Sequence, residues 1–84
     1  MDKQKITVRV AGREYTLVSA DTVEHLSRVA ADVDRQMTEM QSAARTSKEN
    51  AAVLAALNLA DELMKAKDEN ARLRRELTAL HQDE

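Results

Sequence analysis

The stretch ALNLADELMKAKDENARLRRELTALH, residues 56–81, carries a regular heptad repeat. Its a and d positions are apolar except for one asparagine, which is the pattern of a helix that pairs with a second helix along one seam. The predicted seam consists of Ala56, Leu59, Leu63, Ala66, Asn70, Leu73, Leu77 and Leu80. A single asparagine in such a seam fixes the register and favours two strands, at some cost in stability. The repeat therefore predicts a homodimer joined by a coiled coil.

Charged residues on both sides of this seam support the prediction. In a parallel pair, each g position faces the e position of the next heptad on the partner. The facing residues here are Glu62 with Lys67, Glu69 with Arg74, and Glu76 with His81. An ordinary solvated helix face is the alternative, since exposed ion pairs contribute little each. Matching signs at three successive steps favour the parallel dimer.

Residues 5–18 alternate apolar and polar side chains around Ala11 and Gly12, which predicts a β-hairpin. With the turn centred on these two residues, the opposed pairs are Ile6 and Leu17, Thr7 and Thr16, Val8 and Tyr15, and Arg9 and Glu14. All four pairings are favourable across two strands. A two-residue primed turn would strain Ala11, so a type II turn or a longer turn is the alternative. The apolar face of this hairpin needs an apolar neighbour, because an isolated hairpin is marginal in water.

Two helices are expected after the hairpin. Residues 21–44 predict an amphipathic helix that begins with a capping box at Asp21 and Glu24. Its apolar stripe is Val23, Leu26, Ala30, Val33, Met37, Met40 and Ala44. Continuing that stripe would bury Asn58 and Asp61, so we expect a break near residues 44–46, with one continuous helix as the alternative.

The second helix is expected from about Ser47, after a capping signal at Thr46, to beyond Leu80. Its first half carries a second apolar stripe beside the seam, which we expect to receive the first helix and the hairpin. This outer stripe consists of Val53, Leu57, Ala60 and Met64. The expected fold class is α+β and mostly helical, with a head over residues 1–64 and a coiled-coil stalk over residues 65–84.

Composition narrows the classes of function. The chain has 84 residues, one aromatic side chain, no cysteine and a net charge of −2. Such a chain buries little apolar area alone, which again favours a partner helix. The near-neutral charge argues against nucleic-acid binding, and no apolar segment is long enough to span a bilayer. We therefore expect a cytoplasmic protein that is not an enzyme and that has no metal or other cofactor, since His25 and His81 lie far apart without grouped ligands.

Charged residues of the head form a candidate docking surface. They lie near the expected turn and near the joint between the helices: Arg9, Arg13, Glu14, Arg45, Lys48 and Glu49. An ordinary solvated loop is the alternative and the commoner case. Loops that a rigid scaffold holds often carry recognition, however, and a dimer would present two copies of this surface.

Three motifs follow one another along the chain between residues 8 and 63. They are Val8-x-Val10-x-Gly12-Arg13-x-Tyr15-x-Leu17, then Val29-Ala30-x-x-Val33-Asp34, then Ala55-Ala56-Leu57-Asn58-Leu59-Ala60-Asp61-Glu62-Leu63. Together they resemble the ZapA family of bacterial cell-division proteins. The resemblance implies an α+β head, a C-terminal coiled coil, and dimers that can pair into tetramers through the coils. The coil is short compared with longer members, so the resemblance supports the dimer more directly than the tetramer.

The same resemblance implies a partner and a role. Family members bind FtsZ, the tubulin-like GTPase that polymerises at the mid-cell division site, and they bundle its filaments to support the Z-ring. They are not enzymes. The turn at Gly12 and Arg13 and the region of Glu49 match positions implicated in FtsZ contact. A generic dimerisation or scaffold module with an unrelated protein partner is the alternative, and a membrane-surface helix is disfavoured because acids as well as bases flank the apolar stripes.

Overall fold

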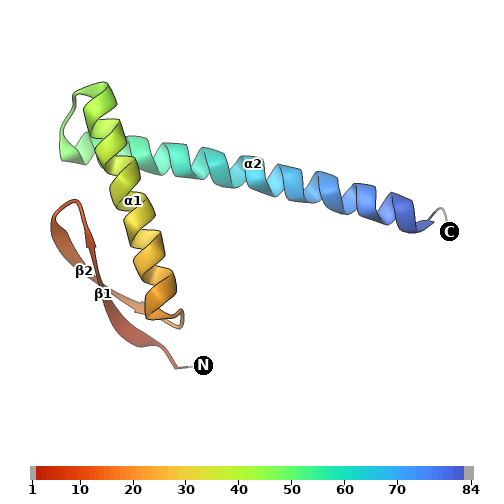
Figure 1. Cartoon of the computed structure of the whole chain (residues 1–84), viewed down its shortest axis with the longest axis horizontal. Coiled ribbons are helices and arrows are strands. Elements are labelled where there is room, and N and C mark those ends of the chain that lie inside the picture. The colour runs from red at the N-terminus through yellow and green to blue at the C-terminus, as the bar shows by residue number, and fades with distance from the viewer. Residues whose placement is uncertain (1, 83–84) are drawn as a thin grey trace.

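The computed structural model describes residues 2–82, which form a hairpin followed by two helices. Strands β1 (Gln4–Val10) and β2 (Arg13–Ser19) pair antiparallel, and helices α1 (Val23–Ala44) and α2 (Lys48–Gln82) follow. The hairpin lies along one side of α1, which crosses the first half of α2, and the rest of α2 projects away as a rod (Figure 1). The Cα atoms span 55 × 38 × 14 Å, so the chain is flat and open rather than folded around a central core. The expected α+β class and element order are confirmed.

The predicted hairpin register is confirmed at all four expected pairs. Each strand extends one residue beyond the expected range, and the hydroxyl oxygens of Thr7 and Thr16 lie 3.1 Å apart across the ladder. The turn differs from the expectation, since Ala11 (φ 53°) and Gly12 (φ 80°) both adopt positive φ, as a two-residue type I′ turn requires. An alanine is costly there, but its backbone makes two long-range contacts. The Ala11 N–H donates to Asp34 Oδ1 (2.7 Å) and Lys48 Nζ donates to the Ala11 carbonyl (3.4 Å).

The predicted break between the helices is also confirmed, and the single continuous helix is wrong. Arg45 takes the left-handed conformation that usually falls to glycine at a helix end, and its N–H donates to the Gln41 carbonyl. The expected caps are each one residue off. Thr22 Oγ1 accepts the His25 N–H at 3.1 Å, and Ser47 Oγ accepts the Asn50 N–H at 3.2 Å. Asp21 instead donates its N–H to Ser19 Oγ, so α1 begins two residues later than expected.

The core is small and lies where α1 meets β1 and α2. Within the described residues, the buried apolar side chains are Ile6, Leu26, Ala30, Ala51 and Ala55. The two buried alanines of α2 have short side chains that let α1 approach closely. Beside them, the buried Gln36 Oε1 accepts a hydrogen bond from Asn58 Nδ2 at 2.7 Å. This bond satisfies the Asn58 side chain at the contact between α1 and α2.

The outer stripe of α2 does not receive α1, which corrects a further expectation. Val53, Leu57 and Met64 are among the exposed large apolar side chains, and Ala60 is exposed as well. The reason is the phase of the helix, since α1 docks on the face that carries Ala51 and Ala55, roughly opposite the outer stripe. The outer stripe is therefore left exposed in the part of the chain that the structure describes.

Candidate functional site

The hairpin turn and the first turn of α2 form a shallow charged cleft in the head. Arg13, Lys48 and Glu49 line it together with Ala11, Tyr15, Met37 and Ala52, around a volume of about 210 Å³. Residues from three separate elements meet here because Lys48 bonds to the turn. We call this the turn–helix cleft. It brings together three of the six residues that the sequence nominated for docking.

The other three nominated residues lie elsewhere on the head. Arg9 and Glu14 face each other across the hairpin, and Arg9 borders a separate depression between β1 and α1. Arg45 occupies the left-handed position at the end of α1. All three are exposed. The head thus carries several charged groups on its surface, with Arg13, Lys48 and Glu49 as the most closely grouped.

Asp34 positions the turn and was missed as a functional residue. Its carboxylate accepts the Ala11 N–H across 23 residues of sequence, in a partly buried position. The bond ties the turn that presents Arg13 to the middle of α1. The sequence offered a weak signal, because Asp34 sits beside Val33 in one of the three motifs, but neither periodicity nor charge assigns it this role.

The predicted seam lies on α2, which is one uninterrupted helix of 35 residues and about 50 Å. In the single chain, Leu63, Leu73, Leu77 and Leu80 are all exposed. The Asn70 amide oxygen accepts a hydrogen bond from Arg74 Nε at 2.6 Å. A row of leucines on water is unfavourable, so this face is the clearest unpartnered surface of the rod.

Ion pairs on the exposed helix surfaces are local. Arg72 pairs with Glu69 and with Glu76 (2.7 Å), and Lys65 Nζ lies 2.9 Å from Asp61 Oδ2. The hydrogen bond from Asp61 raises the pKa of Lys65 above its ordinary value. These pairs solubilise the rod, and two of the acids expected to pair across the seam already have an exposed partner within the chain.

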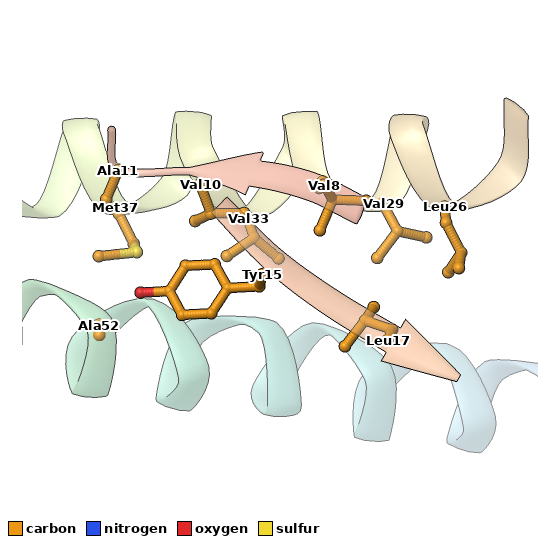
Figure 2. Close-up of a pocket in the computed structure, with 11 residues that line it drawn as sticks. Val8, Val10, Ala11, Tyr15, Leu17, Leu26, Val29, Val33, Met37 and Ala52 are labelled. Carbon is orange, nitrogen blue, oxygen red and sulfur yellow. The ribbon is translucent and has the colours of Figure 1, made fainter. Parts of the chain in front are cut away.

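A second hollow is apolar and lies between the hairpin, α1 and the start of α2. Side chains from all three point into one open space of about 380 Å³, among them Tyr15, Leu17, Val29, Val33, Met37 and Ala52 (Figure 2). We call it the hairpin–α1 groove. Its lining supplies almost no polar group beyond the Tyr15 hydroxyl, so it suits an apolar side chain rather than a charged ligand.

Residues 2–82 contain no group of three or more histidine, cysteine or acidic side chains that could hold a metal ion. Neither helix in this part of the chain is both long and apolar enough to cross a membrane.

These features define a class of small protein in which an α+β head with a charged cleft sits on a long helix that exposes a leucine repeat. A family model described as "Cell division protein ZapA" matches residues 6–83. The chain belongs to this family.

Named relatives agree along nearly the full chain. A "Cell division protein ZapA" of Geobacillus kaustophilus (strain HTA426) is 40% identical over 76 residues, which cover 89% of this chain and 84% of the relative. The protein of the same name in Geobacillus thermodenitrificans (strain NG80-2) is 38% identical, with 84% and 79% covered. A solved structure described as "ZapA mutant dimer from Geobacillus stearothermophilus" superposes with a TM-score of 0.79 at 37% identity, covering 93% of this chain and 92% of that one.

Proposed function

We propose that this chain is a non-enzymatic cell-division protein that dimerises through α2 and cross-links FtsZ filaments, promoting Z-ring assembly at mid-cell. The observation that carries the proposal is the exposed leucine repeat on an uninterrupted helix, in a chain of the ZapA family. The dimer structure of a relative supports self-association. Family membership supports FtsZ as the partner.

The mechanism follows from the placement of the surfaces. Two chains joined along the seam carry two heads, and each head presents one turn–helix cleft. Once one head binds a filament, the other searches for a neighbouring filament at a high effective concentration. Weak contacts then suffice to hold two filaments together. Because exposed charges line the cleft, the bundling weakens as the salt concentration rises.

Light scattering and pelleting of purified FtsZ with GTP test this function. The wild-type chain is expected to raise the scattering and the pelleted fraction at low salt. The substitution Leu73→Glu is expected to abolish bundling by separating the chains. As a matched control, Thr78→Glu adds the same charge outside the seam and is expected to bundle like wild type. A folded dimer that never bundles FtsZ would exclude the cross-linking function and leave the scaffold module with another protein partner.

A further inference from the structure

The hairpin–α1 groove is left open by its own chain. Within residues 2–82, α1 packs against β1 and α2, whereas β2 makes no comparable contact with either helix. Tyr15 and Leu17 on β2 are therefore 47% and 43% exposed, although they point into the groove. The groove is a hollow on the surface with an apolar wall, and an apolar side chain that filled it would remove this wall from water. The groove needs an apolar occupant.

The outer stripe of α2 is an apolar surface that is exposed to solvent. Val53 and Leu57 are 59% and 64% exposed, and they lie at the level of Ala52, which lines the groove. Within residues 2–82 nothing covers them, because α1 occupies another face of the helix. An apolar groove without an occupant and an apolar stripe without a cover thus lie on one chain.

The groove is continuous with the seam. Ala52 lines the groove, and at helical spacing it lies on the same face of α2 as Ala56, Leu59 and Leu63. At about 100° per residue, this face lies roughly 90° around the helix from the face that packs on α1. A partner helix docked on the seam therefore runs past the open side of the groove.

Two-fold symmetry then decides which side chains reach the groove. The outer stripe lies about 100° beyond the seam on the same helix. In a parallel pair, the two chains are related by a 180° rotation about an axis parallel to the α2 helices. The outer stripe of the partner's α2 therefore points in nearly the same direction as the one in which α1 lies from the first chain's α2. That direction leads into the space beside α1 on the seam side, where the groove opens.

We propose that the hairpin–α1 groove of each chain receives Val53 and Leu57 of a second copy, so that each head is completed by the partner's α2. This inference rests on the homodimer proposed above and adds a swapped contact between the head of one chain and the rod of the other. It gives a reason for the open core. The head of one chain leaves space for the helix of the other, and the distance between the two heads is then fixed by packing.

Cysteine cross-linking tests the contact directly, because the chain has no cysteine of its own. One preparation carries Leu17→Cys and the other carries Leu57→Cys; they are mixed, allowed to exchange chains and oxidised gently. We expect a disulfide-linked species of about twice 9.4 kDa that contains one chain of each kind. Val18→Cys replaces Leu17→Cys as the control, because its side chain alternates to the opposite face of β2, and it is expected to give little product.

A seam variant separates this inference from the proposed dimer. Leu73→Cys alone is expected to link two identical chains across the seam. If the seam cysteines link but the groove pair Leu17→Cys and Leu57→Cys does not, and the neighbouring pair Tyr15→Cys and Val53→Cys also fails, the dimer stands and the swapped contact is wrong. If the seam cysteines also form no disulfide, both the proposed dimer and the swapped contact are wrong.

Substitution gives a second measurement on the unmodified chain. Leu57→Glu places a charge in the groove of the partner and is expected to raise the dissociation constant of the dimer at least about tenfold. Val18→Glu is the matched control, since Val18 is 65% exposed and points away from the groove. Equal dissociation constants for the two variants would overturn the proposal.

Discussion

The substitution Leu73→Glu gives the most direct test of the seam. Leu73 lies at a d position in the middle of the rod, and it is 51% exposed in the single chain. Fully burying a leucine stabilises by about 1.5–3 kcal/mol, so covering the exposed half contributes roughly 1 kcal/mol per chain. The substitution removes this contribution twice in a dimer, for a loss of roughly 2 kcal/mol.

A charge penalty adds to the lost burial. The two new carboxylates would face each other in an apolar seam, which costs at least about another 2 kcal/mol. The total of roughly 4 kcal/mol corresponds to a dissociation constant about a thousandfold higher. The isolated helix loses little, because residue 73 already lies on the exposed surface of α2 in the single chain.

Sedimentation equilibrium over a range of micromolar concentrations measures this change. We expect wild type and Thr78→Glu to sediment as dimers where Leu73→Glu sediments as a single chain. Circular dichroism at the same concentrations reports whether helix is lost together with the partner. An unchanged dimer for Leu73→Glu would refute the heptad frame, because that frame places residue 73 at a buried d position of the seam.

Three further predictions concern other residues. Asn70→Leu is expected to raise the melting temperature by several degrees while admitting higher oligomers, as measured by calorimetry and light scattering; a lower melting temperature would mean that Asn70 is not in a dimer seam. Arg13→Ala is expected to reduce FtsZ pelleting without changing dimerisation. The control is Arg28→Ala, which removes an exposed arginine of α1 and is expected to change neither. Wild-type bundling by Arg13→Ala would show that the turn has no role in recognition. Asp34→Ala removes the acceptor of the Ala11 N–H and is expected to cost about 1–3 kcal/mol and to speed hydrogen exchange at that amide. The control Asp32→Ala loses an exposed ion pair with Arg35 and is expected to cost well under 1 kcal/mol of stability. An equal loss of stability in the two variants would mean that Asp34 does not stabilise the turn.

Local patterns predicted the parts of the fold that depend on neighbouring residues. The alternation from Ile6 to Leu17 fixes the hairpin register, because a shift by one residue would move every apolar side chain to the other face. The change in apolar phase after Ala44 predicted the break between the helices, even though no glycine or proline marks it. Both are consequences of side-chain spacing, which can be read directly from the chain.

Contacts between distant residues could not be predicted in this way. Asn58 was expected outside the interior because it is polar, and its partner Gln36 could not be foreseen, since it is 22 residues away and nothing local pairs them. The backbone of Ala11, whose φ is positive, makes hydrogen bonds with Asp34 and Lys48, which lie on two other elements. For the same reason the sequence nominated Arg13, Lys48 and Glu49 as charged head residues without indicating that they share one cleft. The hairpin–α1 groove was missed because residues such as Tyr15, Leu17, Val33 and Met37 were expected to pack on apolar neighbours, which leaves no space between them.

The incomplete core links the stability of this chain to its proposed function. In the described part of the chain, the buried large apolar side chains are Ile6 and Leu26, while thirteen others remain exposed. A domain of this size needs most of its apolar surface covered to offset the entropy of ordering the chain. The seam, the outer stripe and the groove are among the surfaces left open, and in the dimer proposed above a second copy would cover all three. A bivalent connector works only while its two heads stay joined. In the proposed dimer each head would be completed by its partner, so separating the two chains would also expose part of each core.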